Sequence, residues 1–173
     1  MKAKNVEKVF NAFGKKVVRT ARGILNAKGT NTSGNLADSL GYQLKVYPSG
    51  GLELQFLGEG YARIVDEGVR GSKSSAKAPK SPFKYTNKQP PSGVIDKWAV
   101  RKGIQGVRNK KGQFIKRKSL VFLIARNIKL FGVKPTNFFS DALNEELKHL
   151  PTNIARAYAQ DAGKFIRTVT QQM

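Results

Sequence analysis

The stretch LGYQLKVYPSGGLELQFL, residues 40–57, decides the fold class. Apolar and polar side chains alternate from Leu40 to Val46 and again from Leu52 to Phe56, which is the period of a half-buried strand. Pro48–Gly51 between them supplies the residue types of a hairpin turn. The stretch therefore predicts a small antiparallel β-sheet. Helical patterns on both sides of it make the expected fold α+β.

Apolar residues at spacings of three and four predict a long N-terminal amphipathic helix over about residues 4–27. The same spacing predicts a two-turn helix over residues 61–68 and helices over about 92–102, 120–131, 140–150 and 152–169. Ser92, Ser119 and Thr152 are the expected N-caps. The residues expected to face inward in the later part of the chain are Val94, Ile95, Trp98, Ala99, Leu120, Leu123, Ile124, Ile128, Phe131, Phe138, Phe139, Ala155, Tyr158, Ala162, Phe165, Ile166 and Val169.

Positive charge dominates the composition and is unevenly placed. The chain has 32 Lys and Arg against 11 Asp and Glu, a formal net charge of +21. Residues 70–118 contain 15 basic residues and one acidic residue, and residues 1–30 contain eight basic residues and one acidic residue. Such asymmetry indicates a surface that meets a polyanion, either nucleic acid or an acidic protein face.

The segment from 69 to 118 divides into two parts. Residues 69–91 are rich in Lys, Ser and Pro and predict an exposed arm. Residues 104–116 predict a small basic β-hairpin with its tip at Asn109–Gly112. Such a hairpin can follow phosphates without reading bases. The residues that we expect to contact nucleic acid or an acidic partner are Arg101, Lys102, Arg108, Lys110, Lys111, Lys116, Arg117 and Lys118.

Several classes of chemistry find no support in the sequence. The chain has no Cys and one His, His149, which excludes thiolate zinc sites and multi-histidine metal sites. Asp141 and Glu145 share a helix face but have no third ligand at metal-binding spacing. No phosphate-binding loop, no apolar run long enough to span a membrane and no signal peptide is present. We therefore expect no enzyme activity, cofactor, metal site or membrane span.

Three short motifs carry a resemblance to a known family. Residues 34–40 read GNLADSL, residues 61–68 read YARIVDEG, and residues 135–143 read PTNFFSDAL. In type and spacing they resemble the neck or tail-completion family of tailed bacteriophages, which comprises head–tail joining proteins and minor tail components. The likeness covers about residues 5–68 and 133–170. The residues that match the family motifs are Tyr61, Asp66, Gly68, Pro135, Phe138 and Phe139.

The resemblance implies a structural virion protein, made in the host cytoplasm, that assembles as a six- or twelve-fold ring at the head–tail junction. Its implied partners are copies of itself and portal, adaptor or tail proteins, with packaged DNA as a further candidate. It also implies a core domain formed by residues 1–68 and 133–173. Residues 69–132 are then a basic insertion made of an arm, a Trp98-containing helix, the basic hairpin and another helix.

The charge by itself favours a different function, a free protein that binds nucleic acid without sequence preference through residues 70–118. Such a protein has no reason to contain the motifs at 61–68 and 135–142. It also predicts a monomer or dimer whose DNA affinity falls steeply with salt.

Overall fold

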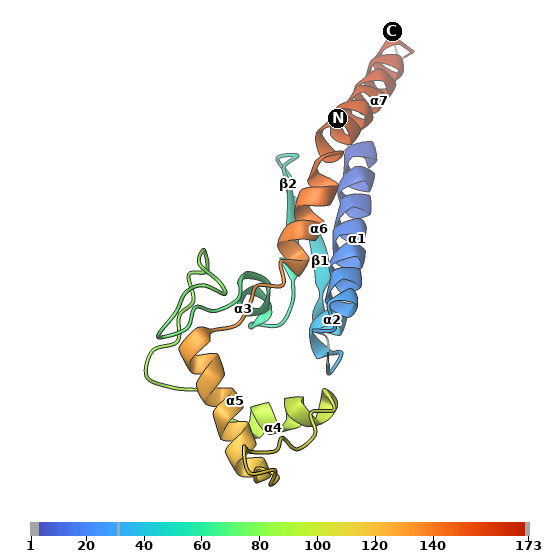
Figure 1. The fold of residues 1–173 in the computed structure, drawn as a ribbon. Coiled ribbons are helices and arrows are strands. Elements are labelled where there is room, and N and C mark those ends of the chain that lie inside the picture. The colour runs from blue at the N-terminus through green and yellow to red at the C-terminus, as the bar shows by residue number, and fades with distance from the viewer. Residues whose placement is uncertain (1–3, 31, 172–173) are drawn as a thin grey trace. The chain divides into compact units, whose positions relative to one another are not determined.

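The computed structural model describes residues 4–30 and 32–171. Within them it contains seven helices and one two-stranded antiparallel sheet (Figure 1), so the predicted α+β fold class is confirmed. The chain divides into two compact units. Unit 1 comprises Met1–Ala27, Leu36–Glu59 and Phe138–Met173, and unit 2 comprises Lys28–Asn35 and Gly60–Asn137. Unit 2 thus takes in the motif at 61–68 as well as the basic segment.

Unit 1 is built on the long helix α1 (Lys4–Ala27), which forms as its spacing predicts. Strands β1 (Gly41–Val46) and β2 (Leu52–Leu57) pair in the register Gly41↔Leu57 to Val46↔Leu52. The turn is closed by the Tyr47 and Gly50 amides, each of which donates at 2.9 Å, and Gly50 has φ +85°. The short helix α2 (Asn35–Ser39) leads into β1. The hairpin prediction is therefore confirmed.

One face of the hairpin packs on helices. The Phe56 ring lies between Phe13 of α1, 6.4 Å away, and Phe139, 5.1 Å away, with edge-to-face geometry at both contacts. Gly14 of α1 lies under the ring of Tyr42, and a Cβ at that position would be 2.5 Å from the ring. This glycine weakens the helix locally and in return lets β1 approach it closely.

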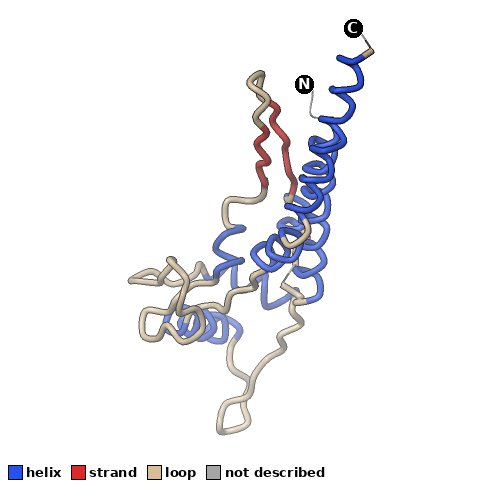
Figure 2. The backbone as a smooth tube through the Cα atoms, turned by 90° about the horizontal axis from the view of Figure 1, so that it is seen from above, coloured by secondary structure: helices blue, strands red, loops and turns tan. Residues whose placement is uncertain are grey.

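Helices α6 (Phe138–Leu147) and α7 (Leu150–Thr170) both pack on α1 (Figures 1 and 2). Phe138 is 1% exposed and anchors the core as expected. Pro151 starts α7 rather than ending α6, because a proline in the first helical turn gives up an amide that has no helical partner. The expected cap at Thr152 is therefore wrong, and the N-cap residue is His149.

The Asp161 carboxylate, in α7, ties that helix to the start of α1. It accepts hydrogen bonds from the Asn5 amide at 3.0 Å, the Val6 amide at 3.2 Å and the Asn5 side chain at 2.8 Å. Asp161 is buried. A carboxylate at this place satisfies amides that a helix N-terminus leaves free and complements its positive dipole.

Unit 2 contains α3 (Ala62–Glu67), α4 (Ser92–Arg101) and α5 (Arg117–Phe131). Its apolar cluster consists of Ile95, Val121 and Ala125, with Ile124 and Ile128 packed against it. The predicted cap at Ser92 is wrong, because the N-cap is Pro91 and no side chain caps α4. The predicted cap at Ser119 is also wrong, because α5 begins two residues earlier, at Arg117. The residues expected inside but exposed in the structure are Val94, Leu123 and Phe131.

The segment 69–91 is not the exposed arm that its composition predicts. Amides of Ser72 and Lys73 donate to carbonyls in the last turn of α5, at 2.9 and 3.0 Å, and the Ser81 hydroxyl donates to the Gly68 carbonyl at 2.7 Å. Ala78 and Ser81 are buried. The segment is a folded loop that satisfies backbone groups at the end of a helix, a need that composition does not reveal.

Candidate functional site

The basic hairpin of unit 2 forms at the predicted position. Its turn is closed by the Asn109 amide, which donates to the Gln113 carbonyl at 2.8 Å, and by the Gly112 amide, which donates to the Asn109 carbonyl at 2.9 Å. The Asn109 side chain accepts from the Lys111 and Gln113 amides at 2.9 and 3.0 Å. Such side-chain bonds stabilise a tight turn. They hold the tip rigid, with Lys110 and Lys111 exposed on it.

Arg108 and Phe114 face each other across the hairpin. They form an isolated antiparallel bridge, and the Arg108 guanidinium lies 4.5 Å from the centre of the Phe114 ring. Phe114 is 65% exposed, so the contact between its ring and the Arg108 guanidinium lies at the surface of the protein. A guanidinium stacked on a ring keeps its charge and its outward-facing donors.

Arg117 has a structural task in addition to its predicted role. Its guanidinium pairs with the Asp96 carboxylate at 2.7 Å and donates to the carbonyls of Asp96 at 3.1 Å and Ile104 at 3.2 Å. These bonds hold the start of α5 against α4 and the root of the hairpin. Lys102 is likewise engaged, because its ammonium donates to the Gly29 carbonyl.

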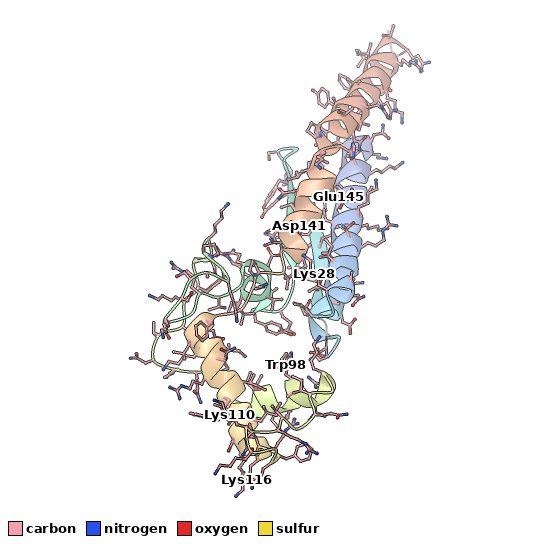
Figure 3. All side chains as sticks on the ribbon, in the orientation of Figure 1. Lys28, Trp98, Lys110, Lys116, Asp141 and Glu145 are labelled. Atoms are coloured by element: carbon pink, nitrogen blue, oxygen red, sulfur yellow. The ribbon has the colours of Figure 1, made fainter. Side chains whose placement is uncertain are left out.

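The remaining predicted contact residues lie at the end of α4, at the hairpin tip and at the start of α5. Arg101, Lys110, Lys111, Lys116 and Lys118 are all exposed, and Figure 3 shows Lys110 and Lys116 at the same end of unit 2. Lys116, Arg117 and Lys118 occupy the N-cap and the first two helical positions of α5, and no side chain caps this end. Cations at the positive end of a helix are unfavourable, and an anion bound there relieves them. This surface, defined by the predicted residues from Arg101 to Lys118, is called the hairpin surface below.

The motif at 61–68 and the start of the motif at 135–143 meet inside unit 2. The Thr136 hydroxyl donates to the Val65 carbonyl at 2.7 Å, and the Asn137 amide donates to the Asp66 carbonyl at 2.9 Å. Gly68 has φ +71°, and a Cβ there would lie 2.6 Å from the Val133 carbonyl oxygen and from the Pro135 nitrogen. The segments 61–68 and 133–137 are therefore mutually fitted. They do not form a pocket with reactive groups.

The other motif residues have structural positions. Tyr61 is the exposed N-cap residue of α3, and Asp66 is buried. The Ser39 hydroxyl, in the GNLADSL motif, donates to the Leu36 carbonyl at 2.8 Å and accepts from the Glu59 amide at 3.1 Å. In β1–β2, hydrogen bonds from Tyr47 and Gln55 hold the pKa of Glu53 below its usual value.

An apolar stripe on α7 is the feature that sequence reasoning misplaced. Tyr158, Phe165, Ile166 and Val169 were expected to face inward, and all four are exposed. Figure 1 shows the C-terminal end of α7 running past the described start of α1, so the last turns of α7, with Phe165, Ile166 and Val169, extend beyond α1. Tyr158 precedes Asp161, which bonds Asn5 of α1, so its exposure reflects the side of α7 on which it lies. Only Ala157 and Asp161 of the helix are buried. We call these four residues the α7 stripe.

Residues 4–30 and 32–171 contain no group of three His, Asp or Glu side chains placed to hold a metal ion. Asp141 and Glu145 lie one turn apart on α6 and are both exposed (Figure 3). No described helix is long and apolar enough to cross a membrane. In comparisons with known proteins, no family model, no curated protein and no solved structure matches this chain.

Proposed function

We propose that this chain is a structural subunit of a ring-shaped neck at the head–tail junction of a tailed phage, stabilising the connector around the DNA channel. The observation that carries the proposal is the α7 stripe, an apolar surface that no described residue of its own unit covers. Solvent-exposed apolar side chains in a contiguous row mark a surface that another protein covers. The motif resemblance supplies the kind of assembly.

The exposed area supports a subunit that completes its packing with partners. The chain exposes 12003 Å², whereas two compact globules of half its mass would together expose about 10,000 Å². Since that reference already counts the two units as separate bodies, the excess belongs to the units themselves. Protomers of an assembly can leave such surface because neighbouring subunits cover it.

A ring uses heterologous contacts, in which the α7 stripe of one copy meets a different face of the next copy, and such contacts close into a ring when the rotation allows. At about 100° per residue, Arg156, Lys164 and Arg167 lie on the side of α7 opposite the stripe, and the one carboxylate of the helix, Asp161, is bonded to α1. The stripe therefore offers an apolar contact surface without charged side chains from its own helix.

The net charge of +21 requires neutralisation in a ring, because neighbouring copies repel over a screening length of about 8 Å. The hairpin surface is our candidate for the contact that supplies it, with DNA in the channel or acidic faces of portal, adaptor or tail proteins as the polyanion.

The test is deletion of the coding sequence from the phage genome, with complementation by the intact chain. The proposal expects filled heads and free tails that fail to join, and restoration of joined particles by the intact chain. It also expects antibody label at the head–tail junction. Normal joined particles without the protein would overturn it.

The second candidate function is a free protein that binds nucleic acid without sequence preference, favoured by the hairpin surface with its exposed Lys110 and Lys111. In that case the protein is absent from purified particles and remains monomeric or dimeric while it binds DNA.

A further inference from the structure

A second basic surface lies on α1, in unit 1, whereas the hairpin surface belongs to unit 2. Lys8, Lys15, Arg19 and Arg22 follow one another at spacings of seven, four and three residues, which places them in one line along the helix. All four are exposed. The line lies opposite the buried face, which consists of Val6, Phe13, Gly14, Val17, Ala21 and Leu25.

The cations of this line are not used to hold the fold, with one exception. Within residues 4–30 and 32–171, Lys8, Lys15 and Arg19 form no ion pair with a carboxylate. Arg22 donates to the Leu40 carbonyl at 2.8 Å. Lys15 and Arg19 are an i, i+4 pair of like charge, which destabilises a helix by a few tenths of a kcal/mol. Folding alone gives no reason for this arrangement.

Hollows with cationic walls flank the line on both sides. On the α7 side, a hollow of about 350 Å³ is lined by the cations Lys8, Lys16 and Arg156, with Glu146 as its one carboxylate, and its floor includes apolar residues such as Val9 and Phe13. On the β1 side, a hollow of about 450 Å³ is lined by Lys15, Arg19 and Arg22 among others. Both are open concavities where anionic groups of a ligand can enter between α1 and its neighbours.

We propose that this face of α1, the α1 ridge, binds the phosphate backbone of double-stranded DNA. The inference stands on unit 1 by itself and does not depend on ring assembly. From Lys8 to Arg22 the ridge runs about 21 Å at 1.5 Å per residue. A duplex of that length carries about 12 phosphate charges. A straight line of cations with an open concavity on either side fits a linear array of phosphates.

The chemistry between the cations favours DNA over an acidic protein. Protein interfaces have an apolar core, with aromatic side chains and few charges at its centre. Apart from Lys16, the exposed residues between the cations of the ridge are Asn11 and Ala12, small residues that offer no apolar anchor. Small residues let a phosphate backbone come close, and amide side chains hydrogen-bond to phosphate oxygens.

The experiment measures binding of the full chain to a 30-base-pair duplex by fluorescence anisotropy at several salt concentrations. The test variant is Lys8→Gln, Lys15→Gln, Arg19→Gln. The matched control, Lys148→Gln, Lys164→Gln, Arg167→Gln, removes the same charge from exposed positions elsewhere in unit 1. We expect the test variant to lower the slope of log affinity against log salt by about 2.7, or about 40-fold between 50 and 200 mM. The control should change the slope by less than about 0.9, the change expected for the loss of one phosphate contact.

Equal losses in the two variants would overturn the proposal, because net charge would then explain binding. The proposal would also be overturned if the intact protein bound the duplex weakly but bound poly-glutamate tightly, and if the test variant lost the binding to poly-glutamate. That result would assign the ridge to an acidic protein. Circular dichroism checks that both variants keep their helices. DNA binding of each variant is also measured with Lys110 and Lys111 replaced by Gln, which removes the charge at the tip of the hairpin surface. If the intact chain forms no ring but the test variant shows the expected change in slope, the ring proposal is overturned and the proposal that the α1 ridge binds DNA is supported.

Discussion

The α7 stripe allows a sharp separation of assembly from folding, through the double variant Phe165→Gln, Ile166→Gln. Phe165 is 50% and Ile166 is 63% exposed in the protomer. Each therefore leaves roughly 100 Å² of apolar surface for a partner to cover, given the size of such side chains. At about 25 cal/mol per Å², covering both contributes about 5 kcal/mol to an assembly contact.

Because these side chains are exposed, replacing them should change the free energy of unfolding of the protomer by less than about 1 kcal/mol. The association constant should fall by about a thousandfold or more, since about 1.4 kcal/mol is a factor of ten. Light scattering at graded concentrations measures the association, and thermal melting measures the protomer. Gln keeps the helix propensity high, so a loss of helix does not confuse the result.

The matched control is Val94→Gln, Val100→Gln on α4, where the two valines are 61% and 63% exposed. This control should leave association unchanged, because the proposal gives that surface no partner. The reasoning is refuted if the α7 variant assembles like the intact chain. It is also refuted if its melting temperature drops as it would for a core substitution, because the stripe would then be part of the core.

Three further substitutions test the fold by thermal or denaturant unfolding. Phe138→Ala should lower the free energy of unfolding by about 3–5 kcal/mol, since the ring is 1% exposed, and a change near zero would show that the core of unit 1 is misplaced. Asp161→Ala should lower it by about 1–3 kcal/mol by leaving the Asn5 amide without its acceptor, and Asp161→Asn should lose less; equal losses would mean that the hydrogen bonds contribute nothing. Gly68→Ala should destabilise by more than about 1 kcal/mol through φ +71° and the approach to the Val133 carbonyl, and unchanged stability would contradict that geometry.

Local periodicity predicted most of the elements. The alternation in residues 40–57 gave both strands with their turn, and the apolar spacing in residues 4–27 gave α1 to the residue. These patterns succeed because each element buries a face that its own sequence encodes. Helix starts were less predictable, because α7 begins at Leu150 and α5 at Arg117 without the side-chain caps that the sequence suggested.

Long-range roles were not predictable from local patterns. Periodicity shows that one face of α7 is apolar, but it does not show what covers that face, and α1 is too short to do so. The loop 69–91 has few apolar residues, yet its amides cap α5. The sequence does contain glycines at the two points of closest contact, Gly71 and Gly132. A Cβ at either position would lie 2.1 Å from a backbone carbonyl oxygen.

The candidate site was predicted in part. The hairpin tip and its exposed lysines follow from the Asn109–Gly112 turn chemistry. The structural task of Arg117 did not, because its partner Asp96 is 21 residues away in sequence. The α1 ridge could have been found from the sequence, since Lys8, Lys15 and Arg19 share one helical face.

The measurement that tests the central claim most directly is the mass of the purified chain by light scattering, at low and high salt, together with negative-stain imaging. The account predicts closed rings, formed by the chain alone or only when its virion neighbours are added, and no rings from the Phe165→Gln, Ile166→Gln variant. A monomer that binds DNA at every salt concentration tested and never assembles, with or without those neighbours, would contradict it.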